Sequence, residues 1–177
     1  EYISEHLPLK AKVGNNFWDL ACNGIHFLDL ISWYSGEELV KIDTTELDHD
    51  WLESKRPGFM EVTGVLRAFY SKGSELLLES RTDGEEFLIK VETAAGPWII
   101  NEFEGKAEGP SGVSLSGKME LQSEMTGRLV ESIIETGKCE LPSLEESAHI
   151  HCIFLDALRI HWNQNCDSSN YTHVPIT

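Results

Sequence analysis

Residues 14–36, with the sequence GNNFWDLACNGIHFLDLISWYSG, form the stretch around which the rest of the chain is expected to fold. At about 100° per residue, the stretch makes a helix with one apolar side and one polar side. The apolar side consists of Leu20, Ala21, Phe27, Leu28 and Ile31. The polar side consists of Asp19, Cys22, Asn23, His26, Asp29 and Trp33. This second side contains no Lys, Arg or Glu, whereas a solvated helix surface is normally rich in them, so the pattern indicates a side that faces a cleft.

The composition is that of an ordinary globular protein. With 177 residues, 41% of them hydrophobic and 25% charged, the chain is long enough for a sizeable core, and we expect residues 1–177 to form a single domain. The 30 acidic and 14 basic residues give a net charge of -16, which repels phosphate groups, so nucleic acid and membrane surfaces are not expected partners. No apolar run approaches the ~20 residues of a membrane span, and the first residues lack the basic start of a signal peptide, which predicts a cytoplasmic protein.

The cysteines predict reduced thiols, because they are widely spaced and include no Cys-x-x-Cys pair. A zinc site would need Cys22 and His26, one helical turn apart, to be completed by His149, His151 and Cys152. Because His149 and His151 point to different sides of a helix and no second paired motif is present, no metal site is expected.

Strands alternate with clear turn signals along the middle of the chain. Period-two patterns predict strands at residues 38–48, 60–70, 75–81, 87–93 and 98–104, and a short one at 118–122. Asp83 and Gly84 predict a hairpin turn between two of these strands. The sequence also predicts an edge strand or irregular segment at residues 1–13 and a loop at 105–117, with one helical turn at 50–54. The helix at residues 14–36 is expected to be capped by Asn15 and Asn16 and to end at Gly36.

Two helices are predicted near the end of the chain. The first covers residues 123–136, ends at Gly137 and has an apolar face of Met125, Leu129, Ile133 and Ile134. The second begins at Ser143, where Ser143 and Glu146 have the spacing of a capping box. Its predicted buried stripe is Ala148, Cys152, Leu155 and Leu158.

This order of elements predicts an α+β fold, with an open, predominantly antiparallel β-sheet and helices packed on one face. The strands contain more large apolar residues than one helix layer needs to bury: Leu76, Leu78, Phe87, Ile89, Val91, Trp98 and Ile100. We therefore expect the far face of the sheet to pack against a second copy, giving a homodimer or a higher homo-oligomer.

Two segments resemble a known family. The run HFLDLISWYSG at residues 26–36, followed by EELV, resembles the first helix of the C-terminal domain in the Gfo/Idh/MocA oxidoreductases. Residues 137–148, GKCELPSLEESA, are similar to the segment that leads into the closing helix of that domain. The resemblance covers most of residues 14–162 and implies an α+β domain that works beside an N-terminal Rossmann domain.

The resemblance also implies a cofactor and a substrate class. The family uses NAD or NADP, but this chain contains neither a Gly-x-Gly-x-x-Gly motif nor the family's Lys-Pro signature, so the chain alone is expected to bind no dinucleotide. The Rossmann domain and the catalytic lysine are expected upstream, in a full-length protein that acts on a sugar, polyol or nucleotide sugar. Many members have an Asp four residues before the His, and Cys22 occupies that position here.

The candidate catalytic residues are His26 and Asp29. On the resemblance, His26 acts as a general acid or base that moves the hydroxyl proton. The alternative is a structural His26 satisfied by Asp29, three residues along the same helix. The candidate substrate-binding residues are Trp18, Cys22 and Asn23. Asn23 could equally cap a neighbouring turn, and aromatic residues at helical spacing, such as Trp18 and Trp33, are often part of a core.

The leading interpretation is the substrate-binding and oligomerisation domain of an NAD(P)-dependent oxidoreductase. The alternative is a noncatalytic carbohydrate-binding or assembly module. Cys22 favours this alternative, because a neutral thiol cannot orient the imidazole of His26 as a carboxylate would.

Overall fold

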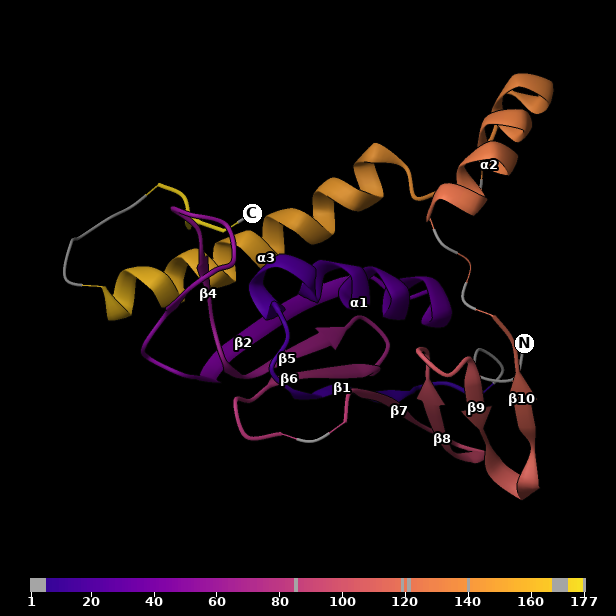
Figure 1. The fold of residues 1–177 in the computed structure, drawn as a ribbon, viewed down its shortest axis with the longest axis horizontal. Coiled ribbons are helices and arrows are strands. Elements are labelled where there is room, and N and C mark those ends of the chain that lie inside the picture. Colours follow the sequence, from indigo (N-terminus) through magenta and orange to yellow (C-terminus); the bar gives the residue numbers. More distant parts are fainter. Residues whose placement is uncertain are drawn as a thin grey trace.

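The computed structural model describes residues 6–84, 86–118, 120, 122–139, 141–166 and 172–176. In these residues the fold consists of an eight-stranded sheet, a two-stranded ribbon and three α-helices (Figure 1). The sheet strands are β1 (Lys10–Asn16), β2 (Leu39–Leu47), β5 (Gly64–Tyr70), β6 (Glu75–Ser80), β7 (Leu88–Thr93), β8 (Gly96–Asn101), β9 (Lys106–Glu108) and β10 (Ser114–Ser116). The ribbon pairs β3 (Leu52–Glu53) with β4 (Met60–Glu61), and the helices are α1 (Leu20–Ser35), α2 (Gln122–Thr136) and α3 (Leu144–Asn165).

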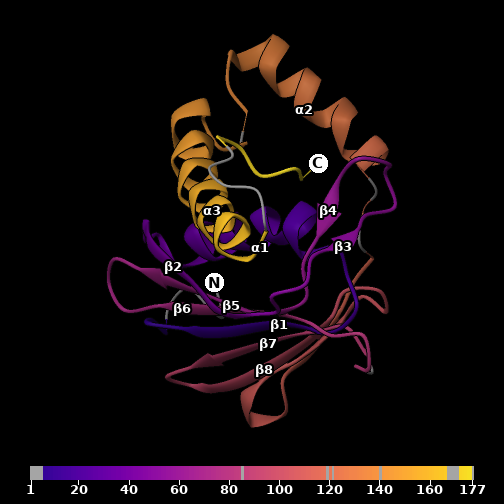
Figure 2. The same cartoon turned by 90° about the vertical axis from the view of Figure 1, so that its left-hand side faces the viewer.

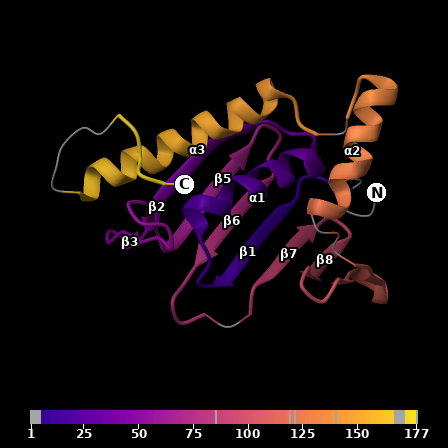
Figure 3. The same ribbon diagram turned by 45° about the horizontal axis from the view of Figure 1, so that its top comes forward.

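The sheet confirms the predicted α+β class. Its order is β10-β9-β8-β7-β1-β6-β5-β2, and every neighbouring pair is antiparallel except β1 and β6, which are parallel. Helices α1 and α3 lie side by side on one face, with α1 against β6 and α3 against β2 (Figures 2 and 3).

The place of β1 corrects two predictions. Residues 10–16 form a central strand, not an edge segment, because Ala11 and Val13 are apolar and face the helices while Pro8 lies outside the strand. Since β1 lies between β6 and β7, the predicted hairpin at Asp83 and Gly84 does not form, and the chain crosses β1 there instead. The strand also runs through Asn16, so the predicted caps at Asn15 and Asn16 are wrong.

Smaller corrections concern the loops. Residues 105–117, predicted as a loop, contain β9 and β10, and the predicted helical turn at 50–54 contains β3. The predicted strand at 118–122 does not appear in its described residues, and Gln122 already belongs to α2. Residues 119 and 121 lie outside the described part of the chain.

The apolar strand residues lie on the face that the helices cover. In the sheet register, Val13 is opposite Leu78 on one side and Ile89 on the other, so the three side chains share a face. Gly24 of α1 lies over this face, where an added Cβ would be 3.2 Å from Leu78 Cδ1. Trp98, further along the sheet, is only 3% exposed and is covered by the backbone of the loop after β9.

The sequence-based prediction of a second copy on the far face assumes that the strands have apolar residues left over after the helices are packed, and this premise is wrong. Of the seven residues that suggested it, five are buried within the chain and Phe87 and Ile100 are half-buried against the same core. The far face instead carries ion pairs, such as Lys12 with Glu79 at 2.5 Å and Lys10 with Glu75 at 3.6 Å. Homo-oligomerisation through this face remains a prediction.

Helix α3 has the predicted start but a different buried side. The Ser143 hydroxyl accepts the N–H of Glu146 at 3.2 Å, and the Glu146 carboxylate accepts the N–H of Ser143 at 2.8 Å, which confirms the capping box. The buried side chains are Ile150, Phe154, Leu158 and His161. Of the predicted stripe only Leu158 is buried, because Ile150 and Phe154 fill the space above the sheet that the smaller Ala148 and Cys152 would leave open.

Helix α2 has the predicted bounds within one residue but is not packed on the sheet. It stands apart from α1, α3 and the strands (Figures 1 and 2). Its apolar side is largely exposed: Met125 by 39%, Val130 by 47%, Ile133 by 46% and Ile134 by 78%. The prediction of helices packed on one face therefore holds for α1 and α3 and not for α2.

A buried glutamate fastens the C-terminal end of α1 to the sheet. Helix α1 ends at Gly36 in the left-handed conformation (φ 62°), and Glu37 next to it is 3% exposed. The Glu37 carboxylate accepts hydrogen bonds from the Ser74 hydroxyl at 2.6 Å, the N–H of Lys72 at 2.6 Å and the N–H of Ser74 at 3.2 Å. Burial alone would raise the pKa of Glu37, but these hydrogen bonds outweigh it and lower the pKa below 4.5.

We predict that Glu37→Gln lowers the free energy of unfolding by about 2 kcal/mol at neutral pH, because an ionised acceptor of three donors is lost. The stabilisation by a carboxylate with a lowered pKa is present above its unfolded pKa of 4.5 and is lost as the pH falls through the folded pKa. Urea unfolding of both proteins at several pH values should therefore show the difference shrinking in acid. Glu38→Gln, at the exposed neighbouring position, is the control; a pH-independent difference would contradict this account.

Candidate functional site

The polar side of α1 faces away from the sheet. Leu20, Ala21, Leu28 and Ile31 are buried, and Phe27 is half-buried against the core. On the opposite side His26 is exposed, Cys22, Asn23 and Asp29 are half-buried, and Trp33 is 70% exposed. The structure thus places His26 and Asp29 on one outward surface.

His26 is free of side-chain partners. Among the described residues, no hydrogen bond or ion pair involves its ring, and none joins it to Asp29. The structural alternative, a histidine satisfied by Asp29, is therefore not what the geometry shows. Nor does the Asn23 side chain make a capping hydrogen bond within the described part of the chain. Both side chains are available to a ligand.

The N-terminus of α1 is capped from another strand. Asp19, the N-cap residue, makes no side-chain cap and instead pairs with Lys55. The Glu61 carboxylate of β4 accepts the N–H of Ala21 at 2.7 Å and the N–H of Cys22 at 3.1 Å. A carboxylate therefore lies at the first turn of α1, even though position 22 itself is a cysteine. This carboxylate binds backbone N–H groups. No local sequence signal could have identified this contact, because the partners are 40 residues apart.

Glu61 has an unusual ionisation. The residue is only 2% exposed, and this burial raises its pKa from 4.5 to about 7, with a further rise from the nearby charge of Asp19. The hydrogen bonds from Ala21 and Cys22 lower the pKa and only partly offset the burial. Glu61 thus titrates at the base of the helix that carries His26.

We predict that Glu61 makes the protein less stable as the pH rises from about 4.5 to about 7. In this range the folded protein retains a proton that the unfolded chain releases, so the free energy of unfolding falls with pH. Over this range the free energy of unfolding falls by at most about 3 kcal/mol relative to that of Glu61→Gln, in which position 61 cannot ionise. Chemical unfolding across this range measures it, with Glu53→Gln on exposed β3 as a control. Parallel pH profiles for wild type and Glu61→Gln would refute the assignment.

An aromatic cluster connects α1 to the strands β7 and β8. The ring centroids of Trp18 and Phe27 are 5.4 Å apart, those of Trp18 and Phe87 5.7 Å, and those of Phe87 and Phe103 6.0 Å. The indole N–H of Trp18 donates to the carbonyl of Glu79 at 2.7 Å, so Trp18 is held in the cluster and its indole N–H is committed to the backbone. Phe103 is 76% exposed.

A hollow that the sequence did not predict lies beside this cluster. It has a volume of about 620 Å³ and is lined by Asn16, Glu86, Phe87, Asn101, Phe103 and Glu104. The side-chain oxygen of Asn16 is buried and has no hydrogen-bond partner among the described residues. Exposed aromatic rings beside amide and carboxylate groups are a common surface for sugar rings. Two of these residues, Phe103 and Glu104, lie in the turn between β8 and β9, and nothing in the sequence pattern of this turn distinguishes it from an ordinary polar loop.

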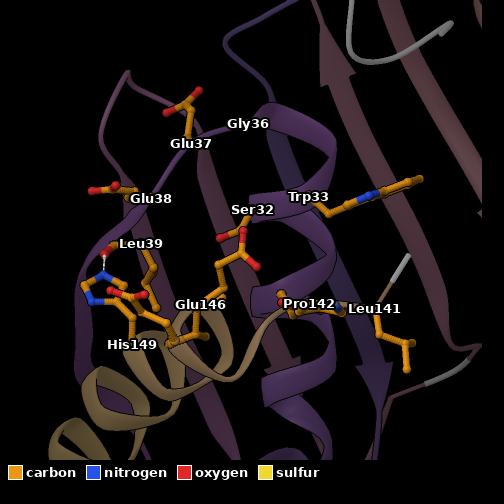
Figure 4. A pocket seen from close by; sticks show the side chains of 13 residues that line it. Ser32, Trp33, Gly36, Glu37, Glu38, Leu39, Leu141, Pro142, Glu146 and His149 are labelled. Carbon is orange, nitrogen blue, oxygen red and sulfur yellow. Dashed lines mark hydrogen bonds between the residues drawn. The ribbon is translucent and has the colours of Figure 1, made fainter. Parts of the chain in front are cut away.

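A second cavity, of about 730 Å³, lies at the other end of α1 (Figure 4). It is enclosed by the last turns of α1, the start of β2 and the N-terminal end of α3. The ring Nε2 of His149 donates to the carbonyl oxygen of Leu39 at 3.0 Å and fixes α3 to β2 at its wall (Figure 4). The lining residues are Asp29, Ser32, Trp33, Gly36, Glu37, Glu38, Leu39, Leu141, Pro142, Glu145, Glu146, His149 and Ile150.

The described residues contain neither a metal-ligand cluster nor a membrane-spanning helix. They contain no group of three or more His, Cys, Asp or Glu residues placed to hold a metal ion. Within the same part of the chain, no helix has the length and apolar character needed to cross a membrane.

The strands and helices give the chain an α+β fold. It is similar to the myo-inositol dehydrogenase from Lactobacillus casei, whose crystal structure is a complex with NAD(H) and myo-inositol. The TM-score is 0.53 at 11% sequence identity, and the similarity covers 94% of this chain and 56% of the enzyme, so the chain spans about half of that enzyme's length. No protein-family model and no curated protein sequence matches the chain. The similarity therefore concerns the fold.

Proposed function

We propose that this chain is the substrate-binding and oligomerisation domain of an NAD(P)-dependent oxidoreductase that acts on a sugar, polyol or nucleotide sugar. One observation carries the proposal: an exposed histidine without side-chain partners on the outward side of α1, in a fold shared with a dehydrogenase. The dinucleotide-binding part belongs to the full-length protein, and the substrate lies between that part and α1.

His26 is the proton carrier in this proposal. In alcohol oxidation the bound nicotinamide accepts the hydride, and the hydroxyl proton must leave to a base. An imidazole exchanges protons near neutral pH, and the free ring of His26 can reach a substrate hydroxyl without first breaking an internal hydrogen bond. Asp29, three residues further on the same side, and Asn23 can accept or donate hydrogen bonds to the other hydroxyl groups.

The sheet face opposite the helices is the proposed oligomer surface. Lys10, Lys90 and Glu92 are exposed there, together with the apolar Ile99, which is 44% exposed. In a two-fold contact each patch meets its own copy, so a face with both charges can pair opposite signs across the axis.

The second candidate function is a noncatalytic carbohydrate-binding module. Cys22 favours it, because among the described residues no carboxylate orients His26. The aromatic hollow with Phe87, Phe103 and the unpartnered Asn16 oxygen would bind a sugar without any redox chemistry. In that case neutral sugars bind this chain alone and His26 is dispensable.

We predict that His26→Ala in the full-length protein lowers kcat about 100-fold or more, the usual contribution of a general acid or base. The free energy of unfolding should change by less than about 0.5 kcal/mol, because the side chain is exposed and makes no contact that folding requires. Steady-state kinetics and thermal unfolding measure the two quantities. His151→Ala, on the exposed side of α3, is the matched control and should keep its activity. Unchanged turnover in His26→Ala would favour the binding module.

Substitution at position 22 separates the two functions further. In an enzyme, Cys22→Asp places a carboxylate one helical turn before His26, and we predict a several-fold rise in kcat, with Cys22→Asn as the uncharged control. In a binding module neither change creates activity. The comparison of kcat among the three proteins is therefore the test.

A further inference from the structure

The cavity at the C-terminal end of α1 has the chemistry of a cation site. We propose that it binds a small organic cation bearing a primary ammonium group. This inference does not rest on the proposed function, because binding here needs neither a dinucleotide nor turnover.

Three carboxylates of the lining are uncommitted. Asp29, Glu38 and Glu145 have no hydrogen bond or ion pair to their side chains among the described residues. The other two lining carboxylates differ: Glu37 is bound by Ser74 and Lys72, and Glu146 completes the capping box of α3. Glu38 and Glu145 are exposed and Asp29 is half-buried, and three uncommitted carboxylates around one cavity attract a positive ligand.

Among the described residues no Lys or Arg lines this cavity, and the one histidine of the described lining, His149, is held on the carbonyl of Leu39. Lys72 contacts one lining residue: its Nζ donates to the carbonyl of Gly36 at 3.3 Å, and the Lys72 side chain is exposed. The cavity also meets the C-terminal end of α1, where the helix carries partial negative charge and its last turn contains no basic residue. The N-terminal end of α3, with the opposite polarity, is capped by Ser143 and Glu146.

Ser32 supplies an unused hydrogen-bonding group in the wall. A helical serine normally donates to the carbonyl four residues earlier, which is Leu28 for Ser32. That carbonyl accepts the hydroxyl of Tyr70 at 3.0 Å in addition to its helical N–H, so both of its lone pairs are occupied. The Ser32 oxygen is buried and has no partner among the described residues, and it can accept an N–H of a ligand.

The remaining walls suit the carbon skeleton of such a ligand. The indole of Trp33 projects from α1 and is 70% exposed, which offers a face for an ammonium group (Figure 4). Leu39 and Ile150 form an apolar floor that is almost fully buried. A volume of about 730 Å³ is within the range of pockets that enclose small molecules.

Isothermal titration of this chain with spermidine, D-glucosamine and D-glucose tests the proposal. The two amines represent the two sources of an ammonium group, a free polyamine and an amino sugar, and D-glucose is the neutral counterpart of the second. We expect at least one amine to bind tenfold or more tightly than D-glucose and to change the fluorescence of Trp33. If neither amine exceeds D-glucose, the proposal is wrong.

Matched variants separate a built site from the general attraction of an acidic protein. Glu145→Gln and Ser32→Ala should each weaken amine binding about fivefold, and Trp33→Leu should remove the fluorescence change. Glu92→Gln removes the same charge from the opposite face of the sheet and should leave the affinity unchanged. Equal weakening by Glu92→Gln and Glu145→Gln would overturn the proposal. Neither result bears on His26, whose test is turnover in the full-length protein.

Discussion

The hydrogen bonds from the first turn of α1 to the carboxylate of Glu61 are the constraint on which the arrangement of the site depends. Helix α1 has no local N-terminal cap, so its free N–H groups are satisfied only when β4 brings Glu61 beneath them. At the other end Glu37 binds the turn between β5 and β6. Two buried glutamates from outside the helix thus determine where its outward side lies. Their ionisation differs, because the hydrogen bonds outweigh burial at Glu37 whereas burial prevails at Glu61.

Three surfaces with different chemistry lie on or beside the helix held in this way. The exposed imidazole of His26 lies in the middle of the outward side, the aromatic hollow with Phe103 lies toward β7 and β8, and the acidic cavity begins at Asp29. Gly24 permits this placement, since its missing side chain lets α1 approach Leu78 and Phe154 closely. The polar residues of α1 stay out of the core, because the orientation of the helix that buries Leu28 leaves His26 on the exposed side.

The exposed apolar side of α2 is the feature that the fold itself leaves unexplained. A helix with Ile133 and Ile134 open to solvent gains little from the sheet, whereas α3 buries Phe154 and Leu158 beside α1.

The sequence by itself determined the features that depend on neighbouring residues. The 3.6-residue period separated the buried and outward sides of α1, the left-handed Gly36 ended it, and Ser143 with Glu146 started α3. Only the tertiary structure decided that β1 lies between β6 and β7, that the apolar strand residues face the helices, and that α2 stays unpacked. The site follows the same division: the sequence indicated His26 and its outward position, whereas the Glu61 cap and both cavities join segments far apart in the chain. A local pattern records which sides of an element are apolar, but which element covers them depends on long-range contacts that no short stretch contains.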